Sequence, residues 1–212
     1  YNHQKLMQAM QAAPPVALRI GATKTIGDYI LGPAIRRFLD APDHQLQFLV
    51  DNTAALLHRL EQGELDFVVL EGVFNKARYD SFLLRNEPYI GICPPGHPLD
   101  GQTISPEALL GQRLILREEG SGTRDLLERA LAQCSYTVEA FSGTVCVSSF
   151  KVIRDLVCAG YGISFVYAAV AADLPAPGRF FCPPLTGSHE LNAVWLKGTD
   201  AGALARAFVA GL

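Results

Sequence analysis

The sequence predicts an α/β protein built from two similar lobes. Short apolar runs of strand length alternate along the chain with stretches whose apolar residues recur at helical spacing. The same order of elements then occurs twice. The segments "GELDFVVL" (residues 63–70) and "AGYGISFVY" (residues 159–167) occupy matching places in the two halves. The repeat lies in the order of elements, not in sequence identity, and it indicates two lobes of one architecture.

The first half predicts three strands and two helices. Thr25 and Asp28 have the spacing of a capping box, which predicts a helix from Ile26 to about Leu39, with Gly32-Pro33 as a place where it can bend or end. Asn52-Thr53 caps a second helix that Gly63 ends. The predicted strands are Val16–Ala22, Gln45–Val50 and Leu65–Leu70.

The second half repeats this order. A helix follows the glycine-rich turn at residues 120–123 and runs to about Cys134, and another follows Ser148-Ser149 and ends at Gly160. The predicted strands are Arg113–Leu116, Thr137–Phe141 and Gly162–Tyr167.

Two further strands predict how the halves connect. The segment "PYIGICPPGHPL" (residues 88–99) leaves the first half, and "LNAVWLKG" (191–198) precedes a last helix, Ala201–Val209. This order predicts that lobe one is discontinuous, with residues 16–92 and 193–212 in lobe one and 93–192 in lobe two. Two connecting strands act as a hinge, and the cleft between lobes is a favoured ligand site. A single doubly wound domain remains the alternative.

Composition excludes several classes of protein. The chain has 212 residues, 49% hydrophobic and 18% charged, with a net charge of −3, and it lacks Lys/Arg-rich runs and apolar runs of membrane-spanning length. We therefore expect no direct nucleic-acid face, no membrane contact and, without a signal peptide, a cytoplasmic location. The five cysteines form no CxxC pair and indicate reduced, buried thiols. The scattered histidines indicate no metal site.

The strand-to-helix turns indicate an anion site. The first N–H groups of a helix lack partners within it, and the helix dipole places partial positive charge there, so such ends bind carboxylate, sulfate or phosphate. In lobe one Thr23 and Thr25 flank Lys24; in lobe two the turn is Gly120-Ser121-Gly122-Thr123, and Ser148-Ser149 precedes another helix.

Each of these turns also has a purely structural interpretation. Asn52-Thr53 is best interpreted as an ordinary helix cap. Lys24 and Arg124 can add positive charge to the site. Alternatively, they point to solvent, or each pairs with the acid four residues on, Lys24 with Asp28 and Arg124 with Glu128.

Other chemistries find no support in the motifs. The turn "GSGTRD" departs from the dinucleotide pattern G-x-G-x-x-G, since Asp125 takes the place of the third glycine, and the chain has no P-loop. No histidine lies in any cap turn, so no Ser/His/Asp arrangement is legible, and Glu118-Glu119 point oppositely if extended. We therefore predict neither catalytic residues nor a cofactor.

Five stretches together resemble the effector-binding domain of LysR-type bacterial transcriptional regulators. They follow one another in order from about residue 16 to 200: "LRIGATKTIGDYILGPAIRRF", "GELDFVVLEG", "YIGICPPGHPL", "LREEGSGTRDLLERAL" and "VSSFKVIRDLVCAGYGISFV". The resemblance implies two Rossmann-like lobes joined by two crossover strands, as in type 2 periplasmic binding proteins. It also implies a DNA-binding helix-turn-helix outside this chain, with residues 1–15 as the end of the linker helix that leads to it.

The resemblance implies a ligand and its binding residues. The effector would be a small anion, either a carboxylate or a sulfur or phosphorus oxyanion, held in the cleft between the lobes. Phe150 would close an apolar wall, which favours an organic anion, whereas the "GSGTR" form favours a sulfur oxyanion. The implied ligand-binding residues are Thr23, Lys24, Thr25, Ser121, Gly122, Thr123, Arg124, Ser148, Ser149 and Phe150.

The resemblance also implies partners. It implies a homodimer, or a tetramer in the full-length protein, with DNA bound only through the helix-turn-helix. Ile30, Leu31, Ile35 and Phe38 carry apolar surface that serves such an interface or, as the alternative, is all core. A transporter-linked solute-binding protein of the same fold is the main rival. An enzyme is a third class, since prephenate dehydratase has this fold and a Thr-Arg pair, but the sequence around Thr123-Arg124 does not resemble that enzyme.

Overall fold

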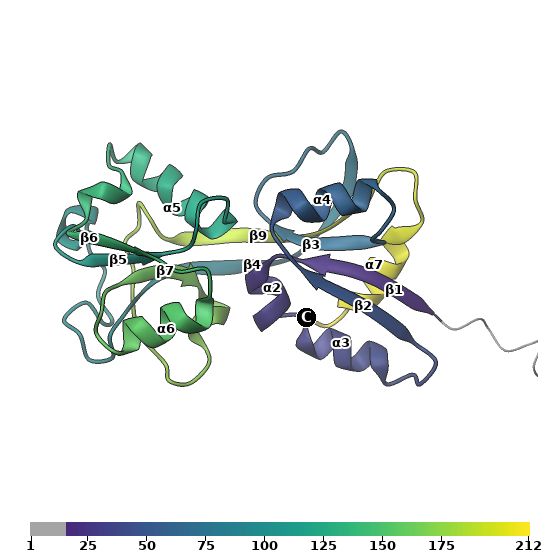
Figure 1. Cartoon of the computed structure of the whole chain (residues 1–212), viewed down its shortest axis with the longest axis horizontal. Coiled ribbons are helices and arrows are strands. Elements are labelled where there is room, and N and C mark those ends of the chain that lie inside the picture. The colour runs from purple at the N-terminus through teal and green to yellow at the C-terminus, as the bar shows by residue number, and fades with distance from the viewer. Residues whose placement is uncertain (1–15) are drawn as a thin grey trace, which may run out of the picture.

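The computed structural model describes residues 16–212 and shows two lobes side by side, with two long strands running between them (Figure 1). These strands are β4 (Tyr79–Cys93) and β9 (Gly187–Leu196). The prediction that residues 1–15 end a linker helix lies outside the described residues. Within residues 16–212, no helix combines the length and the apolar character needed to cross a membrane.

Lobe one is the half that contains the first strand. Its strand β1 lies between β2 and β3, parallel to both, and β3 then pairs with β9 in antiparallel register. Its elements are β1 (Ala17–Ala22), α2 (Lys24–Tyr29), α3 (Gly32–Leu39), β2 (Gln45–Val50), α4 (Thr53–Glu61), β3 (Phe67–Glu71) and α7 (Ala201–Val209).

Lobe two is the other half. Strand β5 pairs in parallel with β6, a parallel bridge joins Leu114 to Ile163 just before β7, and β7 pairs antiparallel with β4. Its elements are β5 (Arg113–Leu116), α5 (Gly122–Gln133), β6 (Gly143–Cys146), α6 (Phe150–Cys158), β7 (Ser164–Tyr167), β8 (Gly178–Phe180) and 3₁₀ turns at Pro106–Leu109, Val138–Ala140 and Ala168–Ala171.

The two lobes repeat one strand arrangement, as the sequence predicted. The order β2-β1-β3 in lobe one matches β6-β5-β7 in lobe two, and in each lobe a crossover strand follows, β9 in lobe one and β4 in lobe two. The crossover strands pair with each other from Tyr79–Leu196 to Tyr89–Gly187. Because the pairing of β4 with β7 begins at Tyr89, both lobes share these strands. The division at residues 92 and 193 stays a prediction.

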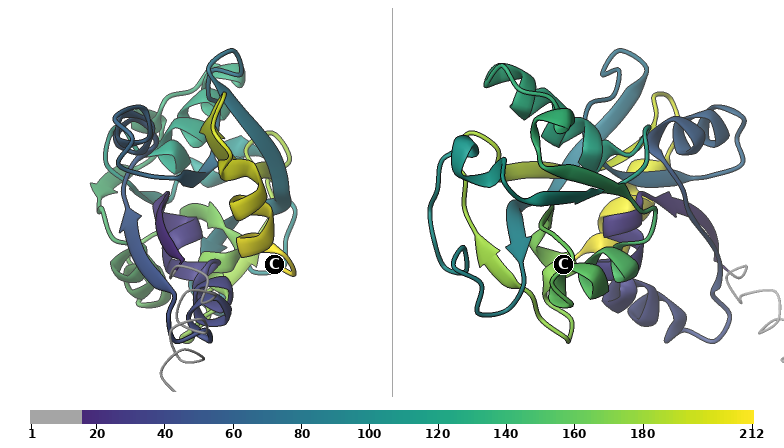
Figure 2. Two further views of the ribbon diagram at one scale, coloured as in Figure 1. Left: turned by 90° about the vertical axis from the view of Figure 1, so that its right-hand side faces the viewer. Right: turned by 60° about the vertical axis from the view of Figure 1, so that its left-hand side comes forward.

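Helices cover both faces of each lobe's sheet (Figure 1). In lobe one, α2, α3 and α7 share one apolar core, and α4 packs on the opposite face through Leu56 and Leu60. Helix α7 lies beside α3 (Figure 2), where an Arg37 guanidinium N–H donates to the Phe208 carbonyl at 2.8 Å. In lobe two, α5 and α6 cover opposite faces. This arrangement of the helices places the first turns of α2, α5 and α6 at the junction of the lobes.

The predicted helix from Ile26 to Leu39 is wrong as one element. It is two helices, α2 and α3, because Pro33 has no N–H to continue the first helix and instead sits in the first turn of the second. The capping box is also wrong, since Thr23 holds the N-cap position and Thr25 lies inside α2. Ile30 and Leu31, between the two helices, are buried, and Ile35 and Phe38 on α3 are partly buried against the same core.

Two further predictions differ from the structure. The strand expected at Thr137–Phe141 is a 3₁₀ turn, and the strand β6 that pairs with β5 begins later, at Gly143. The cysteines are all free, but only Cys93 and Cys182 are buried, while Cys146 is exposed. Val145 in this short strand and Val147 just after it share the half-buried side and Cys146 points to the exposed side, so apolar neighbours in the sequence did not indicate its burial.

Candidate functional site

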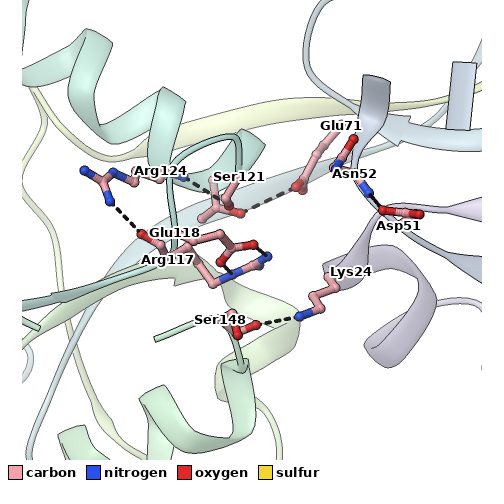
Figure 3. Close-up of polar contacts among 10 residues, drawn as sticks. Lys24, Asp51, Asn52, Glu71, Arg117, Glu118, Ser121, Arg124 and Ser148 are labelled. Atoms are coloured by element: carbon pink, nitrogen blue, oxygen red, sulfur yellow. Dashed lines mark hydrogen bonds and ion pairs between the residues drawn. The ribbon is translucent and has the colours of Figure 1, made fainter. Parts of the chain in front are cut away.

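The candidate site lies where the two lobes face each other beside the crossover strands (Figure 3). Lys24, the first residue of α2, reaches from lobe one and donates a hydrogen bond from Nζ to the Ser148 carbonyl of lobe two at 2.5 Å. The neighbouring Ser149 caps α6 by accepting from the Val152 N–H at 3.3 Å. The sequence-predicted residues of the two lobes are therefore in direct contact, and Lys24 does not pair with Asp28.

The glycine-rich turn begins α5 as the sequence predicted. Gly120 has a φ of +90°, a conformation that glycine adopts without strain, and it brings Ser121 to the N-cap position, where its hydroxyl accepts from the Arg124 N–H at 3.5 Å. Thr123 is buried in the first turn, and its carbonyl accepts from the Tyr89 hydroxyl on β4 at 3.2 Å. The turn is thus fastened to a crossover strand.

Two buried threonine hydroxyls of lobe one have no hydrogen-bond partner within the described residues. They belong to Thr23, the N-cap residue of α2, whose side chain makes no capping bond, and to Thr25. Buried hydroxyls are nearly always satisfied, so each such exception needs an explanation. For Thr23 the explanation is that it lines a cavity, where a ligand or water can accept from its hydroxyl. Thr25 is completely buried and lines neither of the cavities described below.

A cavity of about 180 Å³ lies between the lobes. At roughly 30 Å³ per molecule this is space for about six waters, which suits a small ligand. Three predicted residues line it, Thr23, Lys24 and Ser121, together with Val50, Asp51, Asn52, Glu71, Arg117 and Glu118. A larger and more open cavity of about 620 Å³ adjoins it, and the two share Asn52, Glu71 and Ser121.

Glu71 is the residue that sequence reasoning missed. It ends β3, is buried with 6% of its surface exposed, and accepts a hydrogen bond from the Thr123 hydroxyl through Oε1 at 3.4 Å. Its Oε2 has no partner within residues 16–212. Burial raises the pKa of the Glu71 carboxyl from 4.5 to about 7, and the nearby Arg117 and the Thr123 hydrogen bond oppose this rise. A carboxylate at the end of the fully apolar run "FVVL" was the available signal.

Arg117 was also missed, although it directly follows the apolar strand β5. Its guanidinium is buried and binds the neighbouring Glu118 through two hydrogen bonds of 2.9 Å, which lower the pKa of the Glu118 carboxyl. The guanidinium carbon also lies 4.5 Å from the centre of the Phe150 ring. Phe150 therefore supports Arg117 and packs edge-on against Tyr29; it does not line either cavity.

Arg124 has a structural arrangement. It contacts Glu128, four residues on, at 3.3 Å, and an Nη1 N–H donates to the Arg117 carbonyl at 3.1 Å. This corresponds to the helix-pair alternative considered from the sequence. Arg124 and Gly122 line the larger cavity but not the smaller one. Ser148 is exposed and lines neither cavity.

Asn52 performs the capping role that the sequence predicted. Its side-chain oxygen accepts from the Ala55 N–H at 2.9 Å and begins α4. It also lines both cavities, so a residue whose hydrogen bond is structural still forms part of the wall. Among residues 16–212, no group of three or more His, Cys, Asp or Glu side chains could hold a metal ion.

Comparison with known families decides what kind of domain carries this cleft. Residues 13–212 match the family model described as the LysR substrate binding domain. The chain belongs to this family. The LysR-type effector-binding domain that the sequence resembled is thereby confirmed, and the rival solute-binding interpretation is not favoured.

Curated relatives of this LysR domain are transcriptional regulators. It is 31% identical over 153 residues to the HTH-type transcriptional regulator CbbR of Sinorhizobium medicae, covering 71% of this chain and 48% of the relative. It is 28% identical over 173 residues to the uncharacterized HTH-type transcriptional regulator MJ0300 of Methanocaldococcus jannaschii, covering 81% and 56%. The chain thus spans about half the length of the curated relatives it matches.

Solved structures confirm the two-lobe fold of the LysR domain. The regulatory domain of CcmR from Synechocystis PCC6803, in complex with 2-PG, superposes with a TM-score of 0.81 at 19% identity, covering 92% of this chain and 96% of that one. The reduced OxyR regulatory domain from Pseudomonas aeruginosa gives a TM-score of 0.73 at 25% identity, covering 93% and 97%. These likenesses, with the family match, confirm an effector-sensing regulatory domain of the type 2 periplasmic-binding-protein fold.

Proposed function

We propose that this domain senses a small anion bound in the 180 Å³ cavity between its lobes. One observation carries the proposal: the Thr23 hydroxyl is buried, has no partner within residues 16–212, and belongs to the cavity wall, opposite the first turn of α5. A bound anion would accept from this hydroxyl and from the N–H groups of that turn. The proposed ligand residues are Thr23, Lys24, Ser121 and Thr123, with Gly122 and Ser149 at the helix starts.

The charges around the cavity restrict which anion fits. Arg117 is neutralised by Glu118, whereas the partner of Lys24 is an uncharged carbonyl, so the Lys24 charge remains available to a ligand. Asp51 and Glu71 stand on the same wall and oppose a highly charged ligand. A small anion of one or two charges, a carboxylate or an oxyanion, matches this balance. The solved CcmR regulatory domain in complex with 2-PG supports a small effector at such a domain.

A thermal-shift series tests the proposal. Sulfate, phosphate, acetate and glycolate are each titrated against the domain, with sodium chloride at matched ionic strength as the control. A ligand of the folded state raises the melting temperature as its concentration grows. We expect at least one of the four anions to do so and chloride to have no such effect.

Valine variants place the binding residues. Thr23→Val and Thr123→Val remove one hydroxyl each at nearly constant volume, and both should lose the response to the anion. Thr23→Val should fold at least as stably as the unsubstituted protein, because it removes a buried hydroxyl that has no partner. Thr144→Val, at an exposed position of β6, is the matched control. Full responses from both cleft variants would show that the anion binds elsewhere.

We further propose that the anion acts on DNA binding in a longer protein. The curated relatives named above are HTH-type regulators about twice the length of the matched segment, which supports a DNA-binding part outside this domain. The proposed regulator acts as a homodimer, or as a tetramer at full length. Dimer exchange and DNA mobility shifts of the full-length regulator, with and without the stabilising anion, test this. Unchanged binding to its own promoter at saturating anion would contradict the coupling.

A further inference from the structure

The hydroxyl of Thr123 has only one proton to donate. It donates this proton to Glu71 Oε1 across the junction of the lobes, at 3.4 Å. A hydroxyl has one donor and two acceptor positions, so Thr123 cannot donate at the same time to a bound anion. Either the anion displaces this contact, or the contact reverses so that Glu71 donates and Thr123 accepts.

The surroundings of Glu71 include groups from every neighbouring element. Arg117 approaches from the turn after β5, Tyr89 from β4 and Tyr167 from β7, and the Tyr167 hydroxyl has no partner within residues 16–212. The smaller cavity adds Lys24, Asp51 and Glu118, and the charged residues on the larger cavity beside Glu71 are Glu119, Arg124, Asp125, Glu128 and Arg129.

Two features of this environment favour a protonated Glu71. The side chain is enclosed, and its one hydrogen bond is long for a hydroxyl that donates to a charged carboxylate, a bond that is usually about 2.5–2.7 Å. The Arg117 guanidinium, the closest source of compensation, is bound by Glu118 through both carboxylate oxygens. The resulting pKa of about 7 leaves the proton exchangeable near neutral pH.

Thr123 lines neither cavity while its hydroxyl donates to Glu71, whereas Glu71 lines both. We infer that Glu71 is a positioning residue for the effector: in the bound state its carboxyl O–H donates to Thr123 Oγ1, which frees the Thr123 O–H to turn from Glu71 toward the anion in the cavity. This inference rests on the proposed anion site. The proton comes from solvent, and no other bond forms or breaks. The ionised carboxylate, in contrast, holds the Thr123 proton and repels the anion. Anion binding therefore takes up one proton, and the domain responds to pH through its effector affinity.

Calorimetric titrations across pH test the inference. The probes are sulfate and glycolate, neither of which titrates near neutrality, added to the domain at several values between about pH 6 and about pH 8.5. We expect the apparent Kd to be nearly constant below the pKa that Glu71 has in the anion-free domain. Above that pKa the apparent Kd should rise about tenfold per pH unit. Repeating the titration in buffers of different ionisation enthalpy counts the protons taken up, with about one expected at the alkaline end.

The variant Glu71→Gln supplies the decisive comparison. Its amide N–H can donate to Thr123 Oγ1 at any pH, so it mimics the protonated acid, and its affinity should stay flat with pH and exceed that of the unsubstituted domain at the alkaline end. Glu64→Gln, an exposed change in the pair with Arg59, should keep the ordinary pH profile. Should Glu71→Gln not fold, the proton count on the unsubstituted domain still decides.

The outcomes separate this inference from the proposed function. A Kd that does not vary with pH, no proton uptake, or weaker binding by Glu71→Gln at every pH would overturn the role of Glu71 alone, provided that Thr123→Val still abolishes binding. Failure of both probes to bind at any pH, or full binding by Thr123→Val, would overturn the anion site and this inference together.

Discussion

At the scale of single residues, the cleft depends on polar groups that are buried without full hydrogen bonding. Glu71, Thr23 and Thr25 each hold a side-chain oxygen that lacks a partner within residues 16–212. Such groups cost stability unless a ligand, water or proton compensates them. The protein tolerates this cost at the junction of its lobes, which is where a binding site needs donors that are not already engaged.

The burial of Glu71 should make stability depend on pH. Its pKa is about 7 in the folded domain against an ordinary value of 4.5, so between these values the folded state keeps a proton that the unfolded state loses. The charge-dependent cost of burying Glu71 is therefore absent at acidic pH, grows as pH rises, and reaches its full size above about pH 7. Glu71→Gln, which cannot ionise, should gain about 1–3 kcal/mol relative to the unsubstituted domain between about pH 5 and about pH 8.

Urea unfolding at a series of pH values, without added anions, measures this gain. The difference between the two unfolding free energies is the informative quantity, because any constant offset reflects the new side chain rather than its charge. Glu64→Gln, whose side chain is half-exposed, should show a difference that hardly varies. A constant difference for Glu71→Gln as well would mean that Glu71 ionises normally in the folded domain.

At the scale of elements, the sequence predicted what local chemistry determines. Asn52, Ser121 and Ser149 cap helices where their positions before apolar periodic segments indicated. Helix α7 has the bounds that its pattern predicted. The start of α2 was predicted wrongly because Thr23, Thr25 and Asp28 all have capping chemistry, and tertiary packing decides between them. Gly27 faces β2 so closely that a Cβ there would lie 2.6 Å from Val50, which fixes α2 against the sheet.

The partners of the cleft could not be read from local pattern. Glu71 meets Thr123 across 52 positions of sequence, and Lys24 meets Ser148 across 124. The strand-to-helix turns indicated Lys24, Ser121 and Thr123 as site residues. Glu71 is a single acid at the end of a buried strand, and no sequence spacing connects it with a partner. The misplaced strand at residues 137–141 has a similar cause, since pairing with β5 selects Gly143–Cys146 instead.

The cap of α4 can be tested by comparing two substitutions of Asn52, one that removes the capping oxygen and one that keeps it. Asn52→Ala removes the acceptor of the Ala55 N–H, and loss of a cap costs about 1 kcal/mol. At the size of this domain that lowers the melting temperature by about 2–4 °C. Asn52→Ser keeps a capping oxygen and should retain most of the stability. Equal losses in both variants, measured by thermal unfolding without anions, would show that Asn52 stabilises through cavity-wall packing and not through its hydrogen bond.

At the scale of the whole molecule, the lobes are joined by two strands and by side-chain contacts across the cleft. The crossover strands β4 and β9 pair with each other along most of their length and contribute to both sheets. Across the cleft, polar contacts include the Lys24 bond to Ser148 and the Thr123 bond to Glu71. Apolar contacts include Tyr29 on Phe150 and Ala169 of lobe two against the lobe-one core. Because the contacts near the cavity are polar and exchangeable, a ligand can replace them, and different lobe arrangements can then differ little in free energy, which a switch requires.

A ligand can shift such an arrangement only by binding one form better than the other. The proposed anion, between Thr23 and Thr123, would contact both lobes and so would favour the form in which they are closest. Small-angle scattering should then show a smaller radius of gyration at saturating anion than in sodium chloride of matched ionic strength. Thr123→Val should give the same curve in both solutions, because it keeps the fold but loses the ligand. The unsubstituted domain could also give identical curves although calorimetry shows that it binds the anion. The anion would then be held without closure of the lobes. Its signal to the rest of a regulator would have to travel through local ordering of α2 and α5.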